Sequence, residues 1–184
     1  MPSFSKAQRG FTLIEMMMTI TVFALLLGVA VPSFMETVRN NRLTTQNNEF
    51  IGALNLARSE ALKRSNSVSV CASVDQLTCS GATDWTTGYI VFSDLDADGD
   101  KDPDPDGDPT TDDGDGLLQS AGAAPPEFTL NATNRSFLRF GPTGTSASGI
   151  ETFNLVRTGC VGLKARRIAI SMVGRVSTTT VACP

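Results

Sequence analysis

The sequence contains no histidine among its 184 residues. This absence removes His-based acid–base or nucleophilic catalysis and His metal ligands. GxSxG and HxxE pairs are also missing, so no catalytic constellation appears and an enzyme is not expected. Cysteine is scarce, and its spacings fit no CxxC zinc or thioredoxin pattern; the four cysteines are Cys71, Cys79, Cys160 and Cys183.

Acidic residues are concentrated in one segment. The formal net charge is −4. Eleven Asp and one Lys lie between Asp94 and Asp115, and the rest of the chain has 14 Lys and Arg against 8 Asp and Glu. The body is therefore mildly basic and carries one intensely acidic loop.

Charge is almost absent from a long apolar run near the N-terminus. From Phe11 to Val31 there is no Lys, Arg or Asp, and Glu15 is the only ionisable side chain. A run of about 20 apolar residues is long enough to cross a bilayer as a helix. A carboxylate in such a run is costly in lipid and is expected to have a partner and a function. Lys6 and Arg9 precede the run as the positive flank that stays cytoplasmic. A plain membrane anchor is the alternative.

The residues around this run resemble a known leader. An ordinary secretory signal has a shorter apolar core followed by a small-residue cleavage site, whereas here Gly10 precedes the core. Gly10-Phe11-Thr12-Leu13-Ile14-Glu15, with Pro32 at the end of the run, resembles the class III signal of type IV prepilins and pseudopilins. The resemblance implies cleavage by a prepilin peptidase between Gly10 and Phe11 and N-methylation of Phe11. It makes Glu15 an assembly residue, the fifth of the mature chain, and Pro32 the twenty-second.

Helical patterning continues beyond the apolar run. Apolar residues recur at steps near three and four, at Phe34, Val38, Phe50, Leu54, Ala57 and Ala61. The pattern predicts one helix from about Thr12 to about Lys63. Pro32 lacks an N–H and clashes with the preceding turn, so a kink or local melting is expected there.

Alternating patterns after Ser65 predict short strands. They are Ser67–Cys71, Gly88–Phe92, Phe137–Phe140, Phe153–Val156, Arg167–Ser171 and Arg175–Thr178. The predicted fold class is α+β: a long N-terminal helix, transmembrane and then amphipathic, packed on an antiparallel β-sheet domain as in pilins. The expected organisation is a leader at 1–10, a transmembrane half-helix at 11–32, a periplasmic half-helix at 33–65, and a β-rich domain at 66–184 with an Asp-rich insertion at about 94–116.

The C-terminal half is similar to the GspH/FimT branch of that family. The similar stretches are Trp85–Phe92, Phe140-Gly141-Pro142-Thr143-Gly144, Ala165–Ser171 and Gly174-Arg175-Val176. This branch holds the type II secretion pseudopilin H and minor pilins of type IV pili. The similarity implies a structural subunit near the tip of a pilus or pseudopilus, and the sequence does not separate these two.

The same resemblance implies partners and a location. The expected partners are prepilin peptidase, the inner membrane, and other pilins or pseudopilins through the N-terminal helix. The chain would first be a single-pass protein of the bacterial inner membrane with its domain in the periplasm. Disulfides persist in that compartment. Four cysteines allow three pairings, and locality favours Cys71–Cys79 with Cys160–Cys183. Four buried free thiols are the alternative.

The acidic segment has the spacing of a calcium loop. In one frame Asp94, Asp96, Asp98, Asp100 and Asp102 alternate around Gly99; the second frame contains Asp102, Asp104, Asp106, Asp108 and Asp113. Hard oxygen ligands at alternate residues wrap a cation, although the usual final Glu is missing from both frames. A calcium-dependent structural or adhesive subunit is one alternative. A disordered acidic loop held open by self-repulsion is the other, and no cofactor is required.

Basic residues gather in the last 30 residues. They are Arg157, Lys164, Arg166, Arg167 and Arg175. Some FimT-type minor pilins bind DNA through a C-terminal Gly-Arg-x-Arg, but here Gly174-Arg175-Val176-Ser177 lacks the second Arg. Because phosphate contacts supply most non-specific DNA affinity, a DNA-binding minor pilin of natural transformation, using Arg166, Arg167 and Arg175, is an alternative that is not favoured. An ordinary charged sheet surface is the simpler interpretation.

Overall fold

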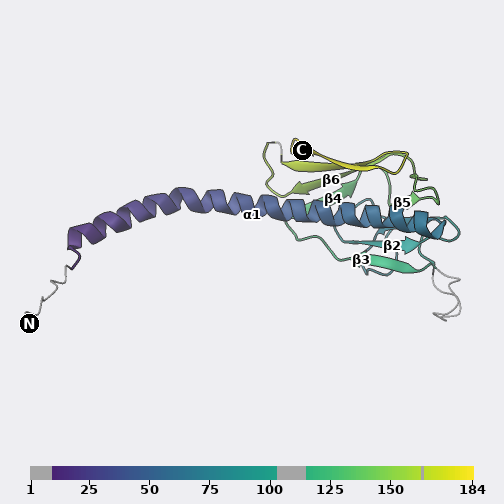
Figure 1. The fold of residues 1–184 in the computed structure, drawn as a ribbon, viewed down its shortest axis with the longest axis horizontal. Coiled ribbons are helices and arrows are strands. Elements are labelled where there is room, and N and C mark those ends of the chain that lie inside the picture. Colours follow the sequence, from purple (N-terminus) through teal and green to yellow (C-terminus); the bar gives the residue numbers. More distant parts are fainter. Residues whose placement is uncertain (1–9, 103–114, 163) are drawn as a thin grey trace, which may run out of the picture. The chain divides into compact units, whose positions relative to one another are not determined.

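The structure of the chain is a computed structural model that describes residues 10–102, 115–162 and 164–184. It divides into two compact units, Met1–Asn41 and Arg42–Pro184. The described residues of the first unit, 10–41, contain the N-terminal part of the long helix, and the second unit contains the rest of the helix and all described strands (Figure 1).

The long helix, α1, spans Leu13–Arg64. Its N-terminus is capped by Thr12, whose Oγ1 accepts the backbone N–H of Glu15 at 3.3 Å. It ends before Ser65, whose φ of 51° is left-handed and cannot continue a right-handed helix. The predicted bounds, about Thr12 to about Lys63, are confirmed to within one residue at each end.

Pro32 does not interrupt α1. The helix is continuous from Leu13 to Arg64 with Pro32 inside it. The local melting considered from the sequence is therefore absent, because neighbouring helical bonds hold the segment despite the missing N–H. A kink at Pro32 stays a prediction.

The eight strands of the described residues form two antiparallel sheets. One sheet has the order β3-β2-β1-β5 and the other β4-β6-β7-β8. Their bounds are β1 Val68–Ala72, β2 Tyr89–Ser93, β3 Leu117–Ala121, β4 Phe128–Ala132, β5 Phe137–Phe140, β6 Glu151–Arg157, β7 Ala165–Ile170 and β8 Val176–Val181. The six predicted strands are present: Phe137–Phe140 coincides with β5, and the other five have shifted ends. The sequence patterns did not predict β3 and β4, and they did not predict that the strands divide between two sheets.

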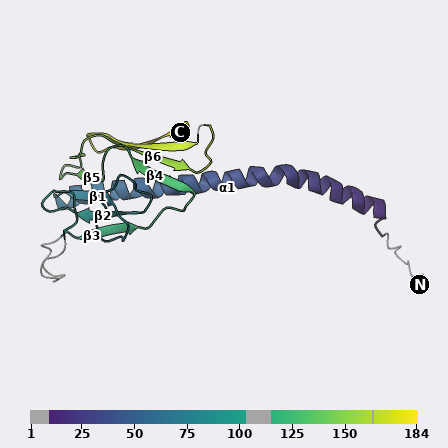
Figure 2. The same cartoon turned by 180° about the vertical axis from the view of Figure 1, so that it is seen from behind.

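The second unit is built around the part of α1 that follows Asn41. Seen from both sides, this part runs alongside β1 and β2 of one sheet and β4 and β6 of the other (Figures 1 and 2). Its buried residues join strands of both sheets in one core cluster. Phe50 contributes most visibly, since its ring lies 4.8 Å from that of Phe153, 5.2 Å from Tyr89 and 5.8 Å from Trp85, all edge-on. Such aromatic pairs stabilise the fold by more than the burial of their surface area alone provides.

The outer face of the first sheet is also covered. All five residues of β1 are buried, although alternate side chains of a strand point to opposite faces. One set, with Val68 and Val70, belongs to the main core, while Cys71 forms a separate small cluster with Ile90 and Phe92. Cys79 and Phe137 pack against this second cluster. The outer face therefore carries the first disulfide and, as described below, the acidic loop.

Candidate functional site

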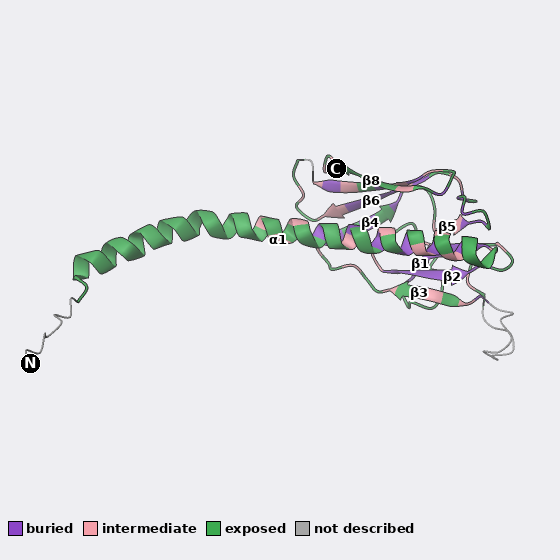
Figure 3. Cartoon of the chain, in the orientation of Figure 1, coloured by how far each residue is buried: buried purple, intermediate pink, exposed green. Residues whose placement is uncertain are grey.

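The N-terminal part of α1 presents apolar side chains that no other described residue buries. Every residue from 10 to 35 is exposed in the single chain (Figure 3). Among the described residues α1 is the one helix whose length and composition would let it cross a membrane. An uncovered apolar surface of this extent is expected to meet lipid or another apolar chain.

Polar side chains in this segment differ in whether they have a hydrogen-bond partner. The Thr19 hydroxyl donates to the carbonyl oxygen of Met16 at 2.9 Å, and that of Thr21 donates to Met17 at 2.8 Å. Such bonds remove the cost of a hydroxyl in lipid. The Glu15 carboxylate, in contrast, has no hydrogen-bond or ion-pair partner within the described part of the chain. It lies in the first turn of α1, where the helix dipole favours negative charge.

The residues of the expected cleavage site precede the first residue of α1. Gly10 and Phe11 are exposed and precede α1. A Cβ added to Gly10 would meet no atom within 4 Å. Whether this bond is cleaved, and whether Phe11 is methylated, stays a prediction at this point.

The structure pairs the cysteines as locality suggests. Cys71 is joined to Cys79 with a Cα–Cα distance of 5.6 Å, and Cys160 to Cys183 with 5.7 Å. No described cysteine is free. Inside the first loop, Asp75 accepts backbone N–H groups from Leu77 at 2.9 Å and Thr78 at 2.8 Å. These donors, with the hydroxyls of Thr78 and Ser73, hold the pKa of the Asp75 carboxyl well below its usual range.

The acidic loop begins directly after β2, and its first three carboxylates converge. Oxygens of Asp94, Asp96 and Asp98 all lie within 4.8 Å of one another. Asp94 is fully buried, and its Oδ2 accepts the hydroxyl of Ser69 on β1 at 2.5 Å. Positive φ angles at Ala97 (63°) and Gly99 (87°) turn the backbone between these residues.

Asp115 closes this loop at its far end. The residue is buried, and its Oδ1 accepts the N–H of Leu95 at 2.9 Å while its Oδ2 accepts that of Asp102 at 3.1 Å. Burial raises the pKa of Asp115 despite these donors. Burial and the neighbouring aspartates, Asp96 first, also raise the pKa of Asp102. Asp115 thus braces the two ends of the loop.

The other described aspartates of the predicted calcium set are not in this group. Asp100 and Asp102 are described but do not join the three converging carboxylates. The others lie outside the described residues: Asp104, Asp106, Asp108 and Asp113.

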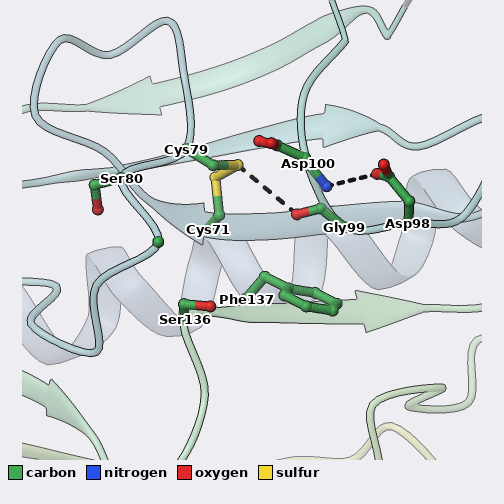
Figure 4. A pocket seen from close by; sticks show the side chains of 9 residues that line it. Cys71, Cys79, Ser80, Asp98, Gly99, Asp100, Ser136 and Phe137 are labelled. Atoms are coloured by element: carbon green, nitrogen blue, oxygen red, sulfur yellow. Dashed lines mark hydrogen bonds between the residues drawn. A yellow bond between two sulfur atoms is a disulfide. The ribbon is translucent and has the colours of Figure 1, made fainter.

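The loop and the first disulfide together line a pocket of about 340 Å³. Figure 4 shows Asp98, Gly99 and Asp100 on one side and the Cys71–Cys79 bond on the other. The Cys79 sulfur is 3.8 Å from the carbonyl oxygen of Gly99; because a disulfide sulfur carries no proton, this is a packing contact. A Cβ on Gly99 would overlap the Phe137 ring, so the loop rests directly on the domain.

The basic residues considered for DNA do not converge. Arg166 and Arg167 are consecutive in β7, so their side chains project from opposite faces of the sheet. Arg166 donates to the Thr180 hydroxyl at 2.9 Å across the strand pair. Arg175 lies in the turn between β7 and β8. The structure therefore does not gather the three arginines into one basic face.

Three residues of these sites were missed in the sequence. Thr12 stands three residues before Glu15, a capping-box spacing that was visible in the sequence. Ser69 and Asp115 support Asp94 and the loop ends. Their roles depend on long-range contacts, for which the sequence holds no local signal.

Comparison with known proteins agrees with this geometry. The family described as "Type II transport protein GspH" matches residues 46–174, and that described as "Prokaryotic N-terminal methylation motif" matches residues 5–31. No curated protein matches the chain significantly.

Two crystal structures of the type IV minor pilin FimU of Pseudomonas aeruginosa (strain PAO1) are similar in fold. One is 22% identical with a TM-score of 0.53, over 74% of this chain and 91% of that chain. The other is 22% identical with a TM-score of 0.56, over 77% and 90%. At this identity the likeness shows the pilin fold alone.

Proposed function

The chain belongs to the GspH family of type II transport proteins, and we propose that it is cleaved after Gly10 and assembled near the tip of a pilus or pseudopilus. As a member of this family it is a minor pilin or pseudopilin subunit. The family and fold are those of structural pilins, which generally need no cofactor, rather than of enzymes. One observation supports the assembly proposal: the apolar half of α1 is exposed, and its one carboxylate, Glu15, has no partner among the described residues.

Glu15 is the residue that we expect to direct assembly. A charged carboxylate in the bilayer needs a cation, and processing would create one in the free amine of Phe11. Within one chain the capping bond to Thr12 already engages the backbone of Glu15 and leaves its carboxylate free. The amine of a neighbouring subunit's Phe11 would then neutralise Glu15, while apolar helices pack together around the pair.

The N-terminal part of α1 would anchor the protein in the membrane. The family of the N-terminal methylation motif supports a membrane-anchored pilin. We infer that the domain lies in the periplasm and that the partners are prepilin peptidase and other pilins. The two disulfides of the second unit support this side, since such bonds persist in oxidising compartments.

Mass spectrometry of the protein extracted from membranes tests the processing step. We expect a chain that begins at N-methylated Phe11, and we expect Gly10→Val to retain residues 1–10 because a bulky residue would no longer fit the peptidase. Gly28→Val is the matched control, since Gly28 also has no atom within 4 Å of an added Cβ but lies far from the cleaved bond. Native protein that still carries residues 1–10 would contradict the proposal.

No observation on the described residues favours a DNA receptor over a structural subunit. Arg166 and Arg167 leave the sheet from opposite faces, and the acidic loop adds negative charge to the same domain. We expect duplex DNA to bind only in the non-specific range of roughly 10⁻⁴–10⁻⁶ M or more weakly, with little change in Arg175→Ala. Submicromolar binding that collapses in this variant would instead assign the protein to DNA uptake.

A further inference from the structure

The first half of the acidic loop has the dimensions of a cation site. Oxygens of Asp94, Asp96 and Asp98 lie within 4.8 Å of one another. Two oxygens that share a calcium ion at about 2.3–2.6 Å lie no more than about 5.2 Å apart. The separations of the three carboxylates are therefore compatible with one ion held between them.

Asp94 supplies an independent reason to expect a ligand. The residue has no exposed surface, and its Oδ2 is engaged by the hydroxyl of Ser69. Its Oδ1 is also buried, yet it has no hydrogen-bond partner among the described residues. A buried polar atom without a partner is costly, and the cost is greater for a carboxylate. This carboxylate belongs to the converging group, so a cation there would satisfy the orphaned oxygen.

The protein itself provides no such cation among the residues described. Their ion pairs are Arg42–Glu127, Lys63–Glu60 and Arg64–Glu60, and none reaches the loop. In the sequence, Lys101 is the only basic residue between Asp94 and Asp115. The backbone N–H groups of Asp98 and Asp100 donate to Asp96 and Asp98, but no basic side chain of the described residues forms an ion pair with the three carboxylates.

The ligand chemistry selects a hard divalent ion. Carboxylate oxygens suit calcium or magnesium, whereas zinc prefers nitrogen and sulfur ligands, and this chain has no histidine. A turning loop of alternate carboxylates suits the variable geometry of calcium better than the strict octahedron of magnesium. We propose that Asp94, Asp96 and Asp98 bind a calcium ion.

The surrounding contacts hold the loop ready for this ion. Asp115 ties Leu95 to Asp102 through its two carboxylate oxygens. Gly99 is buried against the ring of Phe137. The ion would then fix the end of β2 and the loop that rims the pocket beside the first disulfide (Figure 4).

Calorimetry on the full chain in detergent, after removal of metal with a chelator, tests the proposal. We expect one saturable calcium site with a dissociation constant in the range of about 10⁻⁵–10⁻³ M. Magnesium should bind at least about tenfold more weakly, because it gives up its water reluctantly. Absence of saturable calcium binding would overturn the proposal.

Charge-neutralising variants locate the ion. Asp96→Asn and Asp98→Asn should each weaken calcium binding at least about tenfold; both residues are exposed, so these variants should fold even if Asp94→Asn does not. Asp100→Asn removes the same charge outside the converging group and should weaken calcium binding less than about threefold. Equal losses in all three variants would show diffuse attraction to the acidic segment and contradict a site at these three residues.

Thermal unfolding separates binding from screening. A ligand that binds only the folded state raises the melting temperature, so millimolar calcium should stabilise the native chain more than Asp96→Asn. Sodium chloride at the same ionic strength should not reproduce the effect. An equal rise with sodium chloride would overturn the proposal.

Discussion

The Nε of Arg58 on α1 donates a hydrogen bond to the carbonyl oxygen of Gly144, 2.9 Å away. The same guanidinium also donates from Nη2 to the carbonyl oxygen of Val173 at 3.1 Å. One side chain thus ties the helix to two turns that lie far from it in the sequence.

We predict that Arg58→Ala lowers the free energy of unfolding by about 1–3 kcal/mol, because two backbone carbonyls lose a charged donor. Lys63→Ala is the matched control on the same helix. It loses only an exposed ion pair with Glu60, which is worth about 0–1 kcal/mol. Denaturant unfolding of both variants measures the difference, and equal losses would refute the role of Arg58.

Gly174 is a position where only glycine fits. Its φ is +74°, and an added Cβ would overlap the carbonyl oxygen of Gly144. We predict that Gly174→Ala destabilises the chain by about 2 kcal/mol or more, from left-handed strain and the clash. Gly122→Ala should cost much less, since its Cβ would only touch the Gln76 side chain at 3.6 Å. Thermal melting of the two variants decides, and similar melting temperatures would count against this account.

Asp75 should make stability depend on pH in the acid range. Its backbone donors, first Thr78 and then Leu77, lower its pKa below the ordinary value of 3.8. The folded state therefore binds this proton less tightly than the unfolded state, so the stabilisation is present above pH 3.8 and is lost as the pH falls further. Asp75→Ala should lower the melting temperature at pH 7, and the gap to the native protein should narrow below pH 3.8. A gap that stays constant with pH would show that the carboxylate charge is irrelevant.

The second disulfide should stabilise the C-terminus. Cys160 and Cys183 are 23 residues apart, and closing such a loop contributes about 3 kcal/mol on the chain-entropy model. The double variant Cys160→Ser with Cys183→Ser should lose about that amount. Peptide mapping without reductant should recover the two cysteines in one linked peptide. Free thiols at both positions would end this prediction.

Local patterns in the sequence predicted most of the fold. The apolar run and the spacing of Phe50, Leu54 and Ala57 located the helix ends to within a residue. β4 was missed although Phe128, Leu130 and Ala132 alternate as buried residues, so the signal was present. β3 has no buried residue in its five, and such a strand gives little hydrophobic periodicity to detect.

The parts of the fold that the sequence did not predict depend on pairing between strands that are far apart in the chain. Val68 of β1 pairs with Phe140 of β5, and no local pattern announces a contact over such a distance. The same holds for the candidate calcium site. The spacing of Asp94, Asp96 and Asp98 was visible, but the burial of Asp94 and the brace from Asp115 arise only when β1, β2 and the far end of the loop meet.

Incorporation into filaments tests the central claim most directly. Filaments would be purified from cells that carry the native chain, Glu15→Ala or Thr19→Ala, and the amount of the chain in filaments would be compared with that in membranes. Thr19→Ala is the control because its hydroxyl is already satisfied by Met16. We predict native-like incorporation of Thr19→Ala and at least about a tenfold loss for Glu15→Ala, with cleavage and membrane insertion intact, because an intramembrane charge pair is lost. Absence of the native chain from filaments, or equal incorporation of Glu15→Ala, would contradict the account.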